Sequence, residues 1–147
     1  MGHNDPEPVT RFTPSTNLDV VREGYARFNA RDLDWVMDHV DEEITWVDAP
    51  EIPDARTYRG APEVRHYLES IHRNWEHIRF EPQELHEEGD AIVASCRLEG
   101  RGLSSGAEVD ASITHVWRLR NLRVLSIETY FDPRAAAAAL RADEPGE

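Results

Sequence analysis

The period of the hydrophobic pattern drops to two near Trp75, and this change decides the fold class. Before that residue, apolar side chains recur at helical spacing, as at Val64, Tyr67 and Ile71. After it, apolar and polar residues alternate with a period of two, which is typical of half-buried strands. Helices followed by strands predict an α+β domain, because a parallel sheet would require the two patterns to alternate.

Turn and capping residues divide the two halves into elements. Helical patterns cover residues 18–28, 33–40 and 62–75, with Thr16 and Asp32 among the capping candidates. The predicted strands are Ile44–Val47, Ile78–His86, Ala91–Gly100, Glu108–Leu119 and Arg123–Phe131. Residues 48–59 are predicted to be a loop, and a short helix capped by Asp132 follows. We expect residues 1–16 to be a flexible arm, 17–141 to be one domain and 142–147 to be a disordered tail.

The composition excludes several classes of function. The 29 acidic and 16 basic residues give a net charge of −13, which repels nucleic acid. The chain has no lysine, so a Schiff base on a lysine is excluded. No apolar run is long enough to span a membrane. No secretory signal precedes the domain, so we expect a cytoplasmic location.

Neither a metal nor a cofactor is predicted. Cys96 is the only cysteine, which excludes an intrachain disulfide and a thiolate metal cluster. The seven histidines include no pair at the i, i+4 spacing of a helical zinc site. Glycine patterns typical of nucleotide-binding loops are also missing from the sequence.

Five short stretches carry a resemblance to a known fold: Tyr25–Asp34, Ile44–Asp48, Tyr58–Gly60, His115–Arg120 and Glu128–Asp132. In this order they resemble the SnoaL-like and ketosteroid isomerase-like families of the nuclear transport factor 2 superfamily, over about residues 18–140. The resemblance implies a cone-shaped, curved antiparallel sheet with a mixed edge, wrapped around three helices. It also implies an internal pocket for a small apolar or polycyclic ligand, and a homodimer through the outer face of the sheet.

Asp48 is the first candidate for a catalytic residue. It follows Trp46 and Val47 at the end of a predicted strand, and by similarity it lies where ketosteroid isomerase keeps its general base. A carboxylate at the mouth of an apolar cavity loses solvation, which makes it a stronger base. The alternative is an aspartate that caps a turn, since the following Ala49 and Pro50 have ordinary turn chemistry.

His115 is the second candidate. It shares one strand face with Ile113 and Trp117, so we expect it to point into the cavity. By similarity it replaces the aspartic acid that donates to the oxyanion in ketosteroid isomerase, which is a departure from that pattern. An imidazole there would donate to an oxyanion or shuttle a proton. The alternative is a core histidine with a backbone or hydroxyl partner.

Tyr25 is the third candidate, on the inward face of the first helix. Ketosteroid isomerase uses a first-helix tyrosine as an oxyanion donor, but the ungapped match puts that position at Gly24. One residue is about 100° around a helix, so Tyr25 does not inherit the role by spacing. The alternative is a core tyrosine whose hydroxyl reaches the edge of the cavity.

A further set of side chains is predicted to line the pocket by strand parity, helix periodicity and similarity: Trp46, Tyr67, Trp117, Thr129 and Phe131. Most inward aromatic residues are simply part of a core. An aromatic cavity with few polar groups nevertheless suits a polycyclic, terpenoid or polyketide-like ligand.

These observations leave two hypotheses about function. The first is a cofactor-independent enzyme of the isomerase, cyclase, dehydratase or hydrolase type, which transfers protons on an apolar cyclic substrate. In it, Asp48 abstracts or relays a proton and His115 stabilises the oxyanion or returns the proton. The second is a non-catalytic domain for ligand binding or dimerisation. The enzyme requires both side chains to converge on one closed cavity, whereas the binding domain does not.

Overall fold

The computed structural model of this 147-residue chain describes residues 13–142, which form four helices and six strands. In chain order these are α1 (Asn17–Asn29), α2 (Leu33–Asp38), β1 (Val40–Val47), β2 (Thr57–Arg59), α3 (Ala61–Asn74), β3 (Trp75–Glu88), β4 (Ala91–Gly102), β5 (Glu108–Arg120), β6 (Arg123–Tyr130) and α4 (Pro133–Ala142). The α+β class predicted from the sequence is confirmed. The predicted arm and tail lie largely outside the described residues.

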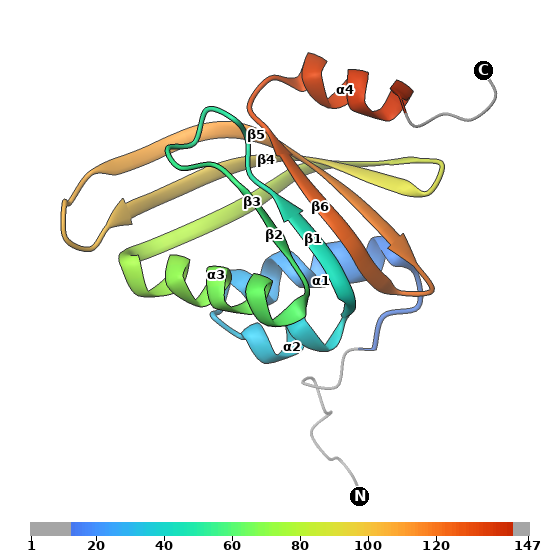
Figure 1. The fold of residues 1–147 in the computed structure, drawn as a ribbon, viewed down its shortest axis with the longest axis horizontal. Helices are drawn as coiled ribbons and strands as arrows, with labels where there is room; N and C mark the ends of the chain where they lie inside the picture. Colours follow the sequence, from blue (N-terminus) through green and yellow to red (C-terminus); the bar gives the residue numbers. More distant parts are fainter. Residues whose placement is uncertain (1–12, 143–147) are drawn as a thin grey trace, which may run out of the picture.

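The six strands form one curved, open sheet in the order β2-β1-β6-β5-β4-β3 (Figure 1). Neighbouring strands are antiparallel except for β1 and β6, which run parallel, with Val47 beside Glu128. Helices α1, α2 and α3 lie on one face of the sheet, here called the inner face, and α4 lies on the outer face (Figure 1). The predicted mixed sheet with three helices on one side is therefore confirmed.

The helices begin where the sequence places their caps. Thr16 Oγ1 accepts a hydrogen bond from the Asp19 backbone N–H at 3.0 Å, at the start of α1. Asp32 Oδ1 does the same for the Trp35 N–H at 3.2 Å, at the start of α2. Asp132 Oδ1 accepts from the Arg134 N–H beside α4 at 2.9 Å. These predicted caps are confirmed, so local side-chain chemistry sets the helix boundaries.

Strands β2 and β1 differ most from the prediction. Strand β2 pairs with β1 inside the stretch 48–59 that we expected to be a loop. Its three residues are too few to show an alternating pattern. Strand β1 begins at Val40 and not at Ile44, because Val40 pairs with Val124 of β6. The acidic residues after Val40 interrupt the apolar pattern and hide this extension.

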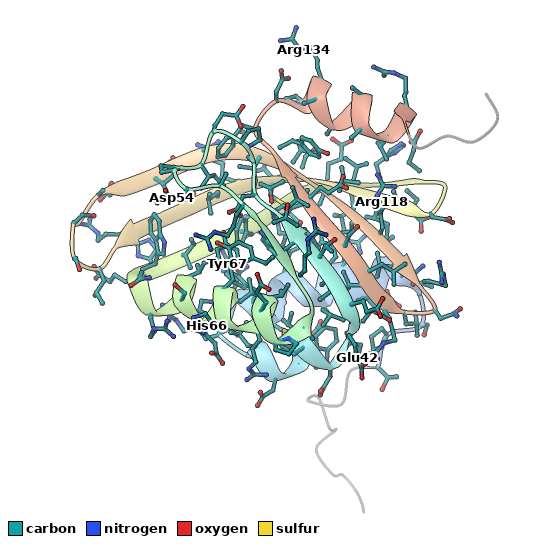
Figure 2. The ribbon with its side chains drawn as sticks, in the orientation of Figure 1. Glu42, Asp54, His66, Tyr67, Arg118 and Arg134 are labelled. Carbon is teal, nitrogen blue, oxygen red and sulfur yellow. The ribbon has the colours of Figure 1, made fainter. Side chains whose placement is uncertain are left out.

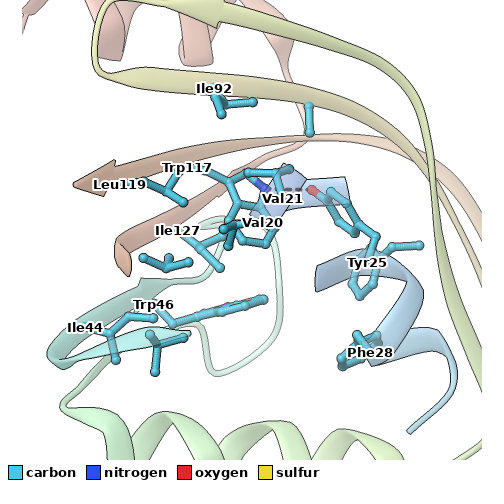
Figure 3. Packing of buried hydrophobic residues seen from close by; sticks show 14 of the residues in the cluster. Val20, Val21, Tyr25, Phe28, Ile44, Trp46, Ile92, Trp117, Leu119 and Ile127 are labelled. Carbon is cyan, nitrogen blue, oxygen red and sulfur yellow. Dashed lines mark hydrogen bonds between the residues drawn. The ribbon is translucent and has the colours of Figure 1, made fainter. Parts of the chain in front are cut away.

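The core lies between the inner face of the sheet and helices α1 and α3, and side chains from both layers point into this space (Figure 2). Val20, Val21, Ile44 and Val64 are each at most 1% exposed. Full burial of a side chain of this size contributes roughly 2 kcal/mol. Figure 3 shows part of this cluster, in which the rings of Trp46, Trp117 and Tyr25 lie among aliphatic side chains.

A second, smaller cluster lies under α4 on the outer face. It joins Ala91 and Val116 of the sheet to Ala136 of the helix. Helix α4 therefore covers part of the face through which a homodimer was predicted, and the homodimer stays a prediction. None of the helices within residues 13–142 is long and apolar enough to cross a membrane.

Candidate functional site

A cavity of about 320 Å³ lies between the inner face of the sheet, α3 and the loop that follows β1. Most of its wall is apolar and includes Ile71, Ile78, Phe80, Leu98, Ile113 and Phe131. The side chains with polar groups in the wall include Asp48, Tyr67, His115 and Thr129. Asp48, His115 and Thr129 are each at most 7% exposed, so the polar groups of this site are largely shielded from bulk water.

Asp48 lies directly after β1, where the loop starts. Its Oδ1 accepts a hydrogen bond from the Tyr67 hydroxyl at 2.8 Å, and its Oδ2 accepts from the Arg56 backbone N–H at 3.3 Å. The Asp48 backbone N–H donates to the Arg56 carbonyl oxygen at 3.2 Å. Asp48 thus forms part of the cavity wall and also ties the two ends of the loop together.

Tyr67 extends from α3 into the space between that helix and the sheet (Figure 2). Its ring stacks on Tyr58 of β2, with 3.9 Å between the ring centroids. Burial, together with the neighbouring Asp48 carboxylate, raises the pKa of Tyr67 far above its ordinary value. Tyr67 therefore keeps its proton and donates to Asp48. The carboxylate oxygens retain further lone pairs that can accept a proton from a ligand.

His115 lies in the middle of β5 and is 1% exposed. Its Nδ1 is 2.7 Å from the hydroxyl oxygen of Tyr25 on α1. The indole N–H of Trp117 donates to the same oxygen at 2.8 Å (Figure 3). The other ring nitrogen, Nε2, has no hydrogen-bond partner among residues 13–142. Burial lowers the pKa of His115 to about 3, so the ring is neutral at physiological pH.

The structure brings most of the expected site residues to one cavity. Its wall contains Asp48, His115, Trp46, Tyr67, Thr129 and Phe131. Asp48 and His115 are 67 positions apart in the sequence (115 − 48) but line the same cavity, because β1 and β5 both pair with β6.

Trp117 and Tyr25 lie elsewhere, around a small apolar space of about 40 Å³ next to α1. Trp117 does not line the larger cavity, where we expected it, because its indole lies over α1 at Gly24. A β-carbon at Gly24 would be 3.3 Å from Cη2 of that ring. Tyr25 directs its hydroxyl at His115 and not at the larger cavity.

Phe80 and the loop residues Ile52 and Pro53 also line the cavity and were not predicted to do so. Phe80 packs beside His115, with 5.2 Å between ring centroids. The sequence carried a signal for it, because Phe80 alternates with Ile78 on one strand face. The loop carried no such signal, since irregular segments have no period.

The site offers one carboxylate, Asp48, and one imidazole, His115, in a wall that is mostly apolar. Within residues 13–142, no group of three or more His, Cys, Asp or Glu side chains is placed to hold a metal ion. The apolar wall suits an apolar ring system, and the Asp48 carboxylate is a group that can accept a proton.

Several solved structures share this fold. A nuclear transport factor 2-like protein of unknown function from Burkholderia pseudomallei is 25% identical, with a TM-score of 0.72 over 86% of this chain and 98% of that one. TerC, co-crystallised with polyporic acid, is 22% identical, with a TM-score of 0.70 over 85% of this chain and 98% of its own.

A third structure is a hypothetical protein from Catenulispora acidiphila with a ketosteroid isomerase-like fold, in complex with trimethylamine. It is 13% identical, with a TM-score of 0.68 over 77% of this chain and 85% of that one. No curated protein sequence matches the chain. The family model of the SnoaL-like domain matches residues 21–127, which is most of the folded region. The chain belongs to the SnoaL-like domain family.

Proposed function

We propose that this protein is a cofactor-independent enzyme that moves a proton on a small cyclic substrate, with Asp48 as the base. The observation that carries the proposal is a buried carboxylate and a buried imidazole in the wall of one mostly apolar cavity. Such a wall excludes water from the base and from the substrate C–H group that loses its proton, and it holds the substrate by apolar contact.

The reaction that suits these groups begins at a carbon next to a substrate carbonyl. The Asp48 carboxylate takes the proton from that carbon, and the C–H electron pair moves into an enolate. If the substrate also carries a C=C bond next to that carbon, the enolate extends over this bond, and return of the proton to its far carbon moves the double bond. This completes an isomerisation and restores the carboxylate, so no oxidant or reductant is consumed. A positioned base of this kind contributes about 10²–10⁴ in rate.

The volume of the cavity limits the substrate. An apolar cavity of about 150 Å³ holds a single benzene ring. The cavity of about 320 Å³ in this protein therefore suits a substrate of one or two rings. Two proteins of the same fold, TerC and the Catenulispora protein, were crystallised with polyporic acid and trimethylamine, which supports an organic ligand for this fold.

Proton exchange on a two-ring ketone tests the proposal. The protein is incubated with 2-tetralone in deuterated water, and deuterium uptake next to the carbonyl is followed by mass spectrometry. We expect the wild type to accelerate uptake, and Asp48→Asn to lower that acceleration by about 10²–10⁴. Asp54→Asn is the matched control, because Asp54 is an exposed acid in the same loop and should leave the rate unchanged.

Equal rates for the wild type and Asp48→Asn would remove Asp48 from the reaction. Saturable binding of 2-tetralone without any exchange would favour the second hypothesis, a non-catalytic domain that holds a ligand. A thermal shift separates these outcomes, since ligand at 100 times its Kd stabilises the folded protein by about 2.7 kcal/mol.

A further inference from the structure

Trp117, Tyr25 and His115 are linked by two consecutive hydrogen bonds, and the donor and the acceptor of each can be assigned from their chemistry. An indole N–H only donates, so the Tyr25 oxygen accepts from Trp117. Burial raises the pKa of Tyr25 well above its ordinary value, so its hydroxyl keeps its single proton. That proton must point at another neighbour.

The Tyr25 hydroxyl has two such neighbours. Nδ1 of His115 lies 2.7 Å away in the buried interior. The Cys96 thiol also interacts with this hydroxyl. Sulfur is a weak acceptor, whereas an unprotonated ring nitrogen is a strong one, so the Tyr25 proton goes to Nδ1. Because a neutral imidazole carries one proton, it then lies on Nε2.

We propose that Trp117 and Tyr25 are positioning residues that hold His115 as the Nε2–H tautomer, so that the cavity wall offers a hydrogen-bond donor to an acceptor oxygen of the ligand. The assignment of the tautomer stands without the proposed function, and its use toward a ligand rests on that function. It removes one of the two roles considered for His115: the ring donates to an oxygen and does not shuttle the proton held by Asp48.

The absence of a hydrogen-bond partner for Nε2 among the described residues favours a ligand that carries a hydrogen-bond acceptor. This nitrogen is buried and has no partner among the described residues, and its side chain lines the cavity. A buried N–H without an acceptor is costly, and a carbonyl or enolate oxygen would satisfy it. The class of ligand is therefore a cyclic ketone or a related carbonyl compound, and a pure hydrocarbon or a protonated amine would leave Nε2 unsatisfied.

Nitrogen NMR of histidine-labelled, ligand-free protein tests the tautomer directly. The His115 signals are assigned by their loss in His115→Gln, and we expect a proton on Nε2 and none on Nδ1. Tyr25→Phe removes the donor to Nδ1 and should let the Nδ1–H tautomer appear. Trp117→Phe provides a second test, because it frees the Tyr25 oxygen to accept from Nδ1–H. A wild-type ring protonated on Nδ1, or tautomers unchanged in both folded variants, would overturn the assignment.

Ligand binding tests whether His115 Nε2–H donates a hydrogen bond to the ligand. We compare 2-tetralone with tetralin, which has the same two rings and no oxygen, and expect the wild type to bind the ketone about 10-fold more tightly. His115→Asn keeps an acceptor for Tyr25 but has no donor at the ε position, so it should lose this preference. His115→Gln places an amide N–H₂ near the ε position and should recover part of it.

The two proposals fail in distinguishable ways. If the ketone binds no better than tetralin, the donor role of His115 is wrong, whatever the rate of exchange. If exchange is independent of Asp48 while the tautomer and the ketone preference hold, the proposed enzyme is wrong and a carbonyl-binding site remains. Asp48→Asn should leave the tautomer of His115 unchanged.

Discussion

Asp48 and His115 share one cavity, but the structure holds them in different ways. Asp48 lies outside the strand, and its carboxylate is bonded to Tyr67 and to the backbone of a loop residue. His115 lies inside β5, with Ala94 of β4 on one side and Thr129 of β6 on the other. The acid is placed where the wall is an irregular loop, whereas the imidazole is fixed in the middle of the sheet.

This difference separates two requirements of one site. A base must meet a substrate that enters, so a position beside a loop is useful. A donor is useful only if its proton stays on the correct nitrogen, and this requires partners that do not move. The following predictions test whether the Asp48 end and the His115 end of the cavity differ as described.

The largest effect should come from the pH dependence of His115. Its pKa is about 3 in the folded protein and ordinarily 6.5. Above pH 6.5 the ring is neutral in both states and the stability is fully present. As the pH falls from 6.5 toward 3, the unfolded chain binds a proton that the folded one does not, so stability is lost. Between pH 7 and pH 5 the loss should be about 2 kcal/mol.

Urea unfolding of the wild type and His115→Gln across this range measures the effect. Burial also lowers the pKa of His72, but that residue is present in both proteins and cancels in the difference. A difference that does not vary with pH would show that His115 is protonated as easily in the folded protein as in the unfolded chain.

Asp48→Ala should have the next largest effect. It removes the acceptor of both the Tyr67 hydroxyl and the Arg56 N–H, at a cost of about 1–3 kcal/mol. Hydrogen exchange should accelerate at the Arg56 amide and stay slow at β5. Glu51→Ala, an exposed change in the same loop, is the control. Equal acceleration in the loop and in β5 would mean that the two ends are not independent.

Tyr67→Phe should cost about 1 kcal/mol, because it removes one hydrogen bond to Asp48 and keeps the ring that stacks on Tyr58. Thermal unfolding gives the value. Tyr58→Phe is the matched variant, since it removes a hydroxyl from the same stacked pair without touching the bond to Asp48. If both variants lose equal stability, the Tyr67–Asp48 bond contributes nothing specific.

The smallest effect should come from Arg56→Gln. The Arg56 guanidinium lies 5.7 Å from the centre of the Tyr58 ring, and an exposed contact of this kind contributes roughly 0.5 kcal/mol. The backbone N–H that donates to Asp48 is kept. A loss well above 1 kcal/mol in denaturant unfolding would mean that this side chain does more for the loop than cover the ring.

The parts of the fold with a strong local signal could be predicted from the sequence. Thr16 and Asp32 cap their helices as expected, and strand parity puts Trp46 and His115 on the inner face. Parity says which face a side chain occupies, but it does not say which helix lies opposite. Trp117 has the parity of His115 and still lies over α1, outside the larger cavity.

The hydrogen-bond partner of His115 was also beyond the sequence. Its contact with Tyr25 joins two residues that are 90 positions apart, and only the packing of α1 on β5 brings them together. An ungapped match placed the family's tyrosine at Gly24. In the structure Gly24 packs against the Trp117 indole, and the hydroxyl of the next residue, Tyr25, is hydrogen-bonded to His115.

The parallel pairing of β1 with β6 has a consequence for how the protein is made. Strands β3, β4 and β5 can pair with one another as they leave the ribosome, because each is antiparallel to the next. The β1–β2 hairpin is synthesised before them, but it joins the sheet only through β6. Closing so long a stretch of chain is slow. We therefore expect the Asp48 side of the cavity to form after the histidine side.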